Sequence, residues 1–194
     1  MDVVELFDRY AERYDSWYDR HEDWFRKEVE LIERVAGSFE RGLEVGVGTG
    51  RFAEKLGIRY GVDLSDRMLE LARSRGVEVV KADAGALPFK DESFDLVLFA
   101  FTLCFLDDPI SALRESKRVL RKDGRVVVCG VPADSELGRE YKNRKDSPFY
   151  SNARLYRVGE VVEILEGLGM RVERIDFADL KYGRDIFCLS ATFN

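Results

Sequence analysis

Residues 43–50 have the sequence Leu-Glu-Val-Gly-Val-Gly-Thr-Gly and lie between an apolar run, 42–47, and an amphipathic segment, 49–57. Glycines at such a place let the chain turn sharply and let backbone N–H groups approach a ligand at a helix N-terminus. The pattern therefore predicts a strand, a glycine loop that binds a ligand, and a helix. The alternative is a tight turn without a ligand.

On both sides of this loop, short apolar runs alternate with amphipathic segments, which is typical of βα units around a parallel sheet. The predicted core strands are 42–47, 58–64, 77–83, 94–101 and 125–131. The predicted helices are 49–57, 66–76, 108–124 and 158–169. The run 94–101 is almost wholly apolar, as expected for a strand that is buried on both faces.

The two ends of the chain depart from this alternation. Residues 132–157 lack periodicity and are expected to form an irregular insertion, whereas 171–180 and 184–193 are expected to form an antiparallel hairpin around Tyr182-Gly183. About forty residues of helix precede the core. Their aromatic residues recur at three-to-four spacing, which indicates an apolar stripe that either closes over a site as a lid or simply packs. They are Phe7, Tyr10, Tyr14, Trp17, Tyr18, Trp24 and Phe25.

These segments together predict an α/β fold. We expect a doubly wound, Rossmann-like, seven-stranded and mostly parallel sheet, with a C-terminal antiparallel hairpin and an N-terminal helical lid. A chain of 194 residues rarely needs a second core.

The composition narrows the class of protein. Lys and Arg number 31 and Asp and Glu number 37, giving a net charge of −6, which disfavours a general nucleic-acid binder. No apolar run approaches the ~20 residues of a membrane span, and the charged N-terminus lacks a signal-peptide stretch, so we expect a cytoplasmic protein. Glutamine is absent and asparagine is rare, which resembles the composition of hyperthermophile proteins, unless it is chance.

The cysteines and the single histidine predict no metal site. Cys104, Cys129 and Cys188 make neither a disulfide framework nor a zinc spacing. Cys129 and Cys188 fall inside predicted strands, where we expect buried, inert thiols. Cys104, at the end of a predicted strand, is expected to fill the core, the alternative being a thiol near the pocket.

Two acidic residues at strand ends indicate the kind of ligand. Asp63 is expected to accept hydrogen bonds from a ribose diol, and Asp83 ends the next strand on the same sheet edge. The alternative for both is helix capping. A dinucleotide motif would place its third glycine at position 51, where Arg51 stands, and no Gly-Lys-Ser/Thr of a P-loop follows. The residues thus indicate an adenosine-like ligand without an obvious phosphate site.

Six motifs in order resemble those of one known family. They are Glu44-Val-Gly-Val-Gly-Thr-Gly50, Gly61-Val-Asp63-Leu-Ser, Asp83-Ala84, Leu87-Pro88-Phe89, Phe94-Asp95 and Val119-Leu-Arg-Lys-Asp-Gly124. Over residues 40–131 the chain resembles the class I S-adenosylmethionine-dependent methyltransferases, especially small-molecule enzymes of the ubiquinone/menaquinone-biosynthesis type. The resemblance implies S-adenosyl-L-methionine as cofactor and S-adenosyl-L-homocysteine as product. It extends more loosely to residues 7–15 and to 156–160.

The resemblance also implies a division of the chain. We expect one methyltransferase domain over 1–194, with a helical lid at 1–38, a cofactor-binding core at 39–131, and a substrate-side insertion, late helix and closing hairpin at 132–194.

The resemblance further implies which residues meet the cofactor. Gly46, Gly48 and Gly50 would face its methionine part, and Glu44 would support the loop. Asp63 would hold the ribose, Leu64 would pack on adenine, and Asp83 and Ala84 would meet the adenine edge. Ala100 would line the cofactor, and Tyr14 would close over its carboxylate.

No residue is assigned as catalytic. Methyl transfer from a sulfonium depends mainly on positioning, and the stretch Phe101-Thr-Leu-Cys-Phe105 offers no obvious polar group. His21 and Tyr18 are the candidates for an acid/base role. The alternative for His21 is a structural or solvent-facing ring.

The acceptor is expected to be a small molecule. Within 132–157, basic residues outnumber Glu140 and Asp146, so this insertion either forms a solvated surface or recognises an anionic acceptor. The basic residues are Arg139, Lys142, Arg144, Lys145, Arg154 and Arg157. The rivals are a non-catalytic S-adenosylmethionine-binding module, a methyltransferase of RNA or protein, and a nicotinamide-dependent oxidoreductase, the last disfavoured by Arg51.

Overall fold

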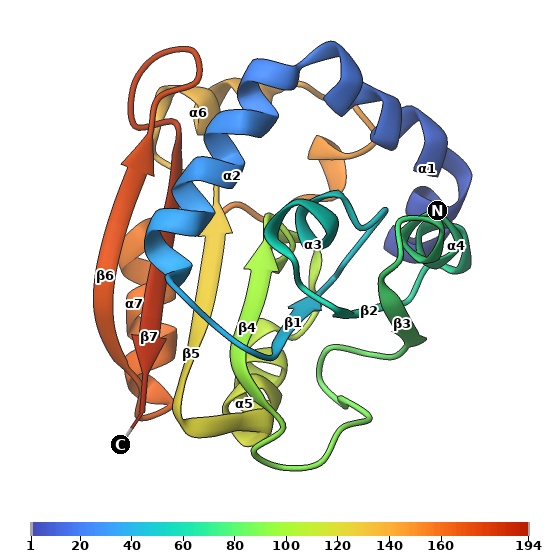
Figure 1. Ribbon diagram of the computed structural model, residues 1–194. Helices are drawn as coiled ribbons and strands as arrows, with labels where there is room; N and C mark the ends of the chain where they lie inside the picture. The colour runs from blue at the N-terminus through green and yellow to red at the C-terminus, as the bar shows by residue number, and fades with distance from the viewer. Residues whose placement is uncertain (1, 194) are drawn as a thin grey trace.

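A computed structural model describes residues 2–193, which form one seven-stranded sheet covered by helices (Figure 1). The strands are β1 (Gly42–Val45), β2 (Tyr60–Asp63), β3 (Glu78–Lys81), β4 (Phe94–Ala100), β5 (Leu120–Gly130), β6 (Arg171–Ala178) and β7 (Ile186–Thr192). The α-helices are α1 (Val3–Arg20), α2 (Glu22–Ala36), α3 (Arg51–Leu56), α4 (Asp66–Ser74), α5 (Pro109–Val119), α6 (Glu136–Asn143) and α7 (Val158–Gly167). Two short 3-10 helices are η1 (Leu103–Phe105) and η2 (Tyr150–Asn152).

The sheet has the order β3-β2-β1-β4-β5-β7-β6. The first five strands pair in parallel, and β7 pairs antiparallel with both β5 and β6. The expected seven-stranded, mostly parallel sheet with a C-terminal hairpin is therefore confirmed. The hairpin loop is longer than the expected tight turn, and Asp185 Oδ2 orders it by accepting hydrogen bonds from the backbone N–H groups of residues 180–183.

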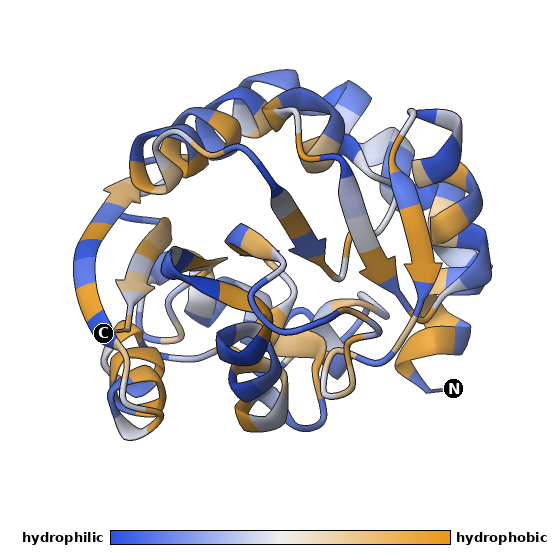
Figure 2. Cartoon of the chain, turned by 60° about the horizontal axis from the view of Figure 1, so that its bottom comes forward, coloured by the Kyte–Doolittle hydropathy of each residue, from blue (hydrophilic) through white to orange (hydrophobic). Residues whose placement is uncertain are grey.

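Helices cover both faces of the sheet, and this explains why β4 is apolar throughout. One buried cluster joins the sheet to α2, α3 and α4, and a second joins it to α5 and α7. Figure 1 shows α2 and α3 in front of the sheet and α5 and α7 behind it. Figure 2 shows hydrophilic and hydrophobic bands alternating along the helices, as expected when one face packs and the other is solvated. None of the helices described is long and apolar enough to cross a membrane.

Two predicted segments differ from the structure, one in its end and one in its regularity. The helix expected at 108–124 ends at Val119, and β5 begins at Leu120, which pairs with Phe94 of β4. Tertiary pairing thus overrides the local helical pattern there. The insertion expected to be irregular contains α6, which Ser135 caps by accepting from the Gly138 N–H at 2.9 Å, and also η2.

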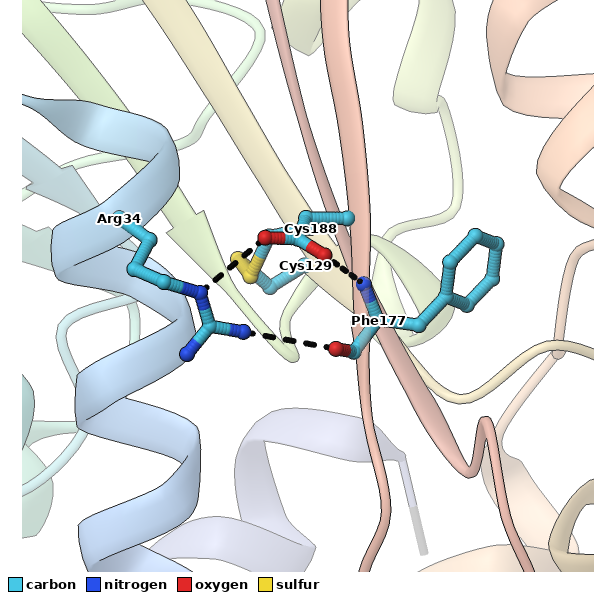
Figure 3. Close-up of a disulfide and its surroundings, with 5 residues drawn as sticks. Arg34, Cys129, Phe177 and Cys188 are labelled. Atoms are coloured by element: carbon cyan, nitrogen blue, oxygen red, sulfur yellow. Dashed lines mark hydrogen bonds and ion pairs between the residues drawn. A yellow bond between two sulfur atoms is a disulfide. The ribbon is translucent and has the colours of Figure 1, made fainter.

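A disulfide joins Cys129 of β5 to Cys188 of β7, so the expectation of unpaired thiols is wrong (Figure 3). Both cysteines are buried as expected, and they are direct partners in the antiparallel register. They are 59 residues apart in sequence, and the spacing of cysteines does not reveal which strands become neighbours. Figure 3 also shows Arg34 of α2 beside the disulfide, where its Nε donates to Asp176 Oδ2 at 3.1 Å.

Candidate active site

The glycine loop between β1 and α3 is left-handed at several positions. Gly46 and Gly48 have φ values of 70° and 52°, a region that favours glycine. A Cβ at Gly46 would lie 2.1 Å from the Thr102 side chain, so this glycine permits close packing. A Cβ at Gly48 would meet only Met68 Sδ, at 4.0 Å. Gly48 therefore faces open space, where a ligand can approach the backbone.

A cavity of about 660 Å³ opens at the carboxyl ends of β1, β2 and β4. It is lined by every residue predicted to bind the cofactor except Gly50, namely Tyr14, Glu44, Gly46, Gly48, Asp63, Leu64, Asp83, Ala84 and Ala100. Gly50 instead caps α3, and a Cβ there would lie 2.9 Å from the backbone of Ala72 in α4. A glycine is therefore needed at position 50 so that the start of α3 can pack closely against α4.

Backbone groups fix the two acids at the strand ends. Asp63 accepts from the Gly48 N–H at 2.9 Å and from the Ser65 N–H at 3.0 Å. Burial nevertheless raises the pKa of the Asp63 carboxyl, because desolvation outweighs these hydrogen bonds. Asp83 accepts from the Gly85 N–H at 2.7 Å. Both carboxylates keep further lone pairs for donors in the cavity, such as ribose hydroxyls or an amino edge.

Glu44 is the most deeply buried acid of this cavity. The residue is 1% exposed, and its Oε2 atom has no hydrogen-bond partner among residues 2–193. Burial raises the pKa of its carboxyl well above the usual range. A buried acceptor without a partner is costly, so this atom suits a ligand that brings a donor.

Helix α1 covers the same cavity and is held there by polar contacts. The Ser65 hydroxyl donates to Asp8 Oδ1 at 2.6 Å, and the Arg67 N–H donates to the same oxygen at 3.1 Å. Figure 1 shows α1 running from α2 across the molecule to α4. Tyr14 of α1 thereby reaches the cavity wall.

A second cavity, of about 280 Å³, lies between α1, α2, β5 and the segment that contains α6 and η2. Both cavities are lined by Tyr14, Tyr18, Phe101 and Phe105, so they meet at these four rings. Phe101 has a φ of 58°, which is strained for a residue with a Cβ. No sequence pattern predicts this strain.

The polar groups at the junction are neutral at ordinary pH. Tyr14 Oη and Tyr18 Oη are 3.0 Å apart, and burial raises the pKa of both hydroxyls. Cys104 lines the second cavity, as the alternative interpretation expected, and its Sγ donates to the Phe101 carbonyl at 3.6 Å. Burial raises the pKa of the Cys104 thiol to about 12.

The remaining candidates divide between the cavity and its surroundings. Tyr18 lines both cavities, whereas His21 lines neither. His21 stacks on Trp17 at the junction of α1 and α2, and its Nδ1 is 2.8 Å from the Trp17 carbonyl oxygen. Of the six basic residues expected in the insertion, Arg144 lines the second cavity and Lys145 does not.

Glu28 is a residue of this site that the sequence interpretation missed. It lies on α2, is 7% exposed and lines the second cavity. A signal was present, since Glu28 precedes Leu31, Ile32 and Val35 by three, four and seven residues and so shares their apolar helix face.

Comparison with known proteins assigns the family. A family model described as "Methyltransferase domain" matches residues 43–128. A solved structure from Thermotoga maritima, described as "SAM-dependent methyltransferase, possible histamine N-methyltransferase", is 38% identical with a TM-score of 0.90, over 99% of this chain and 100% of that chain. The chain belongs to the class I S-adenosylmethionine-dependent methyltransferases, and S-adenosyl-L-methionine is the cofactor of that family.

Other relatives place the chain in the group that includes menaquinone and ubiquinone enzymes. An uncharacterized protein of Methanocaldococcus jannaschii is 38% identical over 192 residues, which is 93% of either chain. A demethylmenaquinone methyltransferase of Thermotoga maritima is 37% identical over 138 residues, covering 64% of this chain and 59% of that one. An uncharacterized protein of Mycobacterium tuberculosis is 43% identical over 132 residues, and the match spans 46% of its length.

Proposed function

We propose that this chain transfers a methyl group from S-adenosyl-L-methionine to a small molecule that enters the second cavity. The observation that carries this proposal is the junction of two cavities at Tyr14, Tyr18, Phe101 and Phe105. The cofactor supplies an electrophilic methyl group on a sulfonium. The protein holds the acceptor in line with that group and excludes water, and such positioning can contribute ~7–11 kcal/mol.

The larger cavity is our proposed cofactor site. Its volume and its carboxylates fit the cofactor: Glu44 offers an unpartnered oxygen for the amino group, Asp63 faces the ribose, and Asp83 faces the adenine edge. Gly48 leaves room for the methionine part. We propose that Leu64, Ala84, Ala100 and Tyr14 pack around the cofactor and that Gly50 shapes the loop without touching it. Gly46, the last of the residues predicted to bind the cofactor, lets the loop pack against Thr102.

Helices α1 and α2 act, in this proposal, as the lid of a single catalytic domain. Helix α1 contributes Tyr14 and Tyr18 to the boundary between the two cavities, and α2 contributes Glu28 to the wall of the second cavity. The raised pKa of both hydroxyls argues against a tyrosinate base at neutral pH. His21 lies away from both cavities, so its stacking on Trp17 supports a structural role.

The mouth of the second cavity supports an acceptor that carries an anionic group. Arg13, Arg20 and Arg144 line it, and no carboxylate of residues 2–193 lies within 4.0 Å of their guanidinium nitrogens. Unpaired arginines present forked donors that match a carboxylate or phosphate. We therefore keep the prediction of an anionic acceptor. We propose that Arg144 contacts its anionic group and that Lys145 does not.

The size of the second cavity favours a small molecule over RNA or protein. Incubation with methyl-labelled cofactor and separated metabolite, RNA and protein fractions tests this directly. We expect label in the metabolite fraction. Label in RNA or protein instead would contradict the proposal. Cofactor binding without label in any fraction would favour a non-catalytic binding module.

We infer that the chain works in the cytoplasm of a hyperthermophile. Disulfides are rare in the cytoplasm of mesophiles but common inside hyperthermophiles. The Cys129–Cys188 bond and the amide-poor composition therefore both support a hyperthermophile origin. A melting temperature above ~90 °C is expected. A midpoint near 60 °C would contradict this inference.

A further inference from the structure

Glu28 is a carboxyl group placed where an apolar side chain would normally stand. It occupies the inward face of α2 and is 7% exposed. Its Oε2 atom has no hydrogen-bond partner, and its carboxylate forms no ion pair, among residues 2–193. Leaving a buried acceptor unpaired is unfavourable, so a partner is expected from outside the chain. The second cavity, which Glu28 lines, is the place where that partner can bind.

Aromatic side chains surround the space in front of Glu28. Trp17 and Tyr18 come from α1, and Tyr141 and Tyr150 stack on each other with ring centroids 3.9 Å apart. Aromatic faces attract cations, and a buried carboxylate does so more strongly. Among residues 2–193, Glu28 itself is the only acidic side chain that lines this cavity. The chemistry of the inner wall therefore matches an amine.

Resting on the function proposed above, we propose that Glu28 binds the nitrogen of a small amine that is the methyl acceptor, so that the chain is an N-methyltransferase. The amine donates an N–H to the Glu28 carboxylate, which lines the cavity. Its anionic group lies at the mouth of the cavity, near Arg13, Arg20 and Arg144. Without that anionic group, the three guanidinium charges would oppose the entry of a cation.

Glu28 also provides a place for the proton that the amine must lose. Burial raises the pKa of Glu28 to about 8, so its carboxylate is basic enough to accept a proton from a bound ammonium. The freed nitrogen lone pair forms a bond to the methyl carbon. The carbon–sulfur bond breaks, and its electron pair remains on sulfur, which changes from a sulfonium to a thioether. The product leaves as a methylated ammonium, and the proton on Glu28 returns to water.

The other titratable groups of the cavity do not compete with Glu28 for this proton, because they do not titrate near pH 8. Tyr14, Tyr18, Tyr141 and Tyr150 face it, and burial together with the nearby Glu28 raises the pKa of the Tyr14 and Tyr18 hydroxyls. Burial also raises the pKa of Cys104 and of Tyr156. The arginines stay charged at all relevant pH values. Of the titratable groups among residues 2–193 that line this cavity, Glu28 is the one with a pKa near 8, so a proton released there when the ligand binds comes from Glu28 or from the ligand.

Calorimetry with two matched probes tests this role. Protein loaded with S-adenosylhomocysteine is titrated with 4-(aminomethyl)benzoate and with 4-methylbenzoate, which lacks the amine. We expect the amine to bind ~10-fold or more tightly than its analogue, as a hydrogen bond between charged groups would give. Titration at pH 7 in buffers of different ionisation enthalpy should show release of about one proton, because Glu28 and the ammonium then share a single proton. At pH 9 this release should vanish.

Two variants complete the experiment. In Glu28→Gln, the preference for the amine and the proton release should both be lost, while 4-methylbenzoate binds as before. Glu30→Gln, on the exposed face of the same helix, should behave as wild type. The role of Glu28 is overturned if the amine shows no preference, if Glu28→Gln retains it, or if neither probe binds the loaded protein. Failure of S-adenosylhomocysteine itself to bind wild type would instead overturn the proposed function, and its unchanged binding to Glu28→Gln shows that this variant folds.

Discussion

Arg51, the first residue of α3, forms a bidentate ion pair with Asp15 of α1 and so joins the end of the glycine loop to that helix. Arg51 Nε donates to Asp15 Oδ1 at 2.7 Å, and Arg51 Nη2 donates to Asp15 Oδ2 at 2.9 Å. Arg75 Nη2 donates to the same Oδ2 at 2.9 Å. Arg51 stands where a dinucleotide motif would have its third glycine. The residue that argues against a dinucleotide thus holds α1 over the larger cavity, our proposed cofactor site.

Replacing Asp15 by asparagine should weaken this attachment. Asp15 and Arg51 side chains are each 16% exposed, so the change removes the buried charge partner of a mostly buried guanidinium and leaves it only the exposed Asp19. We expect a loss of about 2 kcal/mol in the free energy of unfolding, measured with denaturant. Asp19→Asn is the matched control, since Asp19 also pairs with Arg51 but is 64% exposed and should cost less than ~0.5 kcal/mol. Equal losses in the two variants would contradict the account.

The same carboxylate predicts acid sensitivity. Burial raises the pKa of Asp15, but hydrogen bonds from Arg51, Thr49 and Arg75 outweigh this and lower it to about 2. A carboxyl whose pKa is lower in the folded state contributes stability above its unfolded pKa, near 4, and loses it as pH falls toward 2. Unfolding curves of wild type and Asp15→Asn should therefore converge between pH 4 and 2. A constant difference over that range would be the opposite result.

Gly48→Ala should block cofactor binding without unfolding the chain. Gly57→Ala is the control, because both glycines have positive φ, 52° and 73°, and neither Cβ would contact protein atoms closer than 4.0 Å. Both variants should lose a similar ~1 kcal/mol through backbone strain. Only Gly48→Ala should weaken S-adenosylhomocysteine binding, by ~10-fold or more in calorimetry. Equal affinities would show that Gly48 does not face the cofactor.

Arg144→Gln and Lys145→Gln separate a cavity contact from a neighbouring surface charge. Arg144 lines the second cavity, whereas Lys145 is exposed and does not. With S-adenosylhomocysteine present, Arg144→Gln should weaken 4-methylbenzoate binding by roughly 3- to 10-fold, as expected for a charged hydrogen bond at a cavity rim. Lys145→Gln should have little effect, and cofactor affinity should stay constant in both. An effect of Lys145→Gln as large as that of Arg144→Gln would favour a diffuse surface charge.

The disulfide should stabilise the chain by restricting its unfolded state. Cys129 and Cys188 are 59 residues apart, and the chain-entropy model gives about 4 kcal/mol for a loop of that length. Cys188→Ser should lower the melting temperature by roughly 8–16 °C, and reducing agent should do the same to wild type. Cys104→Ser, which alters the free thiol, should not respond to reducing agent differently from wild type. A wild-type melting temperature insensitive to reduction at high temperature would contradict the prediction.

Local patterns sufficed to predict the core of the fold. The apolar run 94–101 predicts a buried strand, because a strand covered on both faces needs apolar residues throughout. The glycines of residues 46–50 predict a tight turn, because left-handed backbone conformations favour glycine. The end of the helix at Val119 could not be predicted in this way. The strand that follows is stabilised by Leu120 pairing with Phe94, a contact between distant segments.

The second cavity was harder to predict for a similar reason. Its walls come from α1, α2, β5 and residues 141–156, and no single motif spans them. Glu28 was visible on an apolar helix face, but an isolated glutamate is usually solvated, and its burial depends on packing against the sheet. The disulfide likewise depends on β7 inserting between β5 and β6.

We propose that the larger cavity binds S-adenosyl-L-methionine through Asp63, the acid at the end of β2. Calorimetry of S-adenosylhomocysteine with wild type, Asp63→Ala and Asp66→Ala tests it most directly. Asp63 lines the cavity, whereas Asp66, three residues later, lies outside it and pairs with Lys81 at 2.7 Å. We predict that Asp63→Ala reduces affinity by ~10-fold or more and that Asp66→Ala leaves it unchanged. Equal affinity of all three proteins would contradict the account.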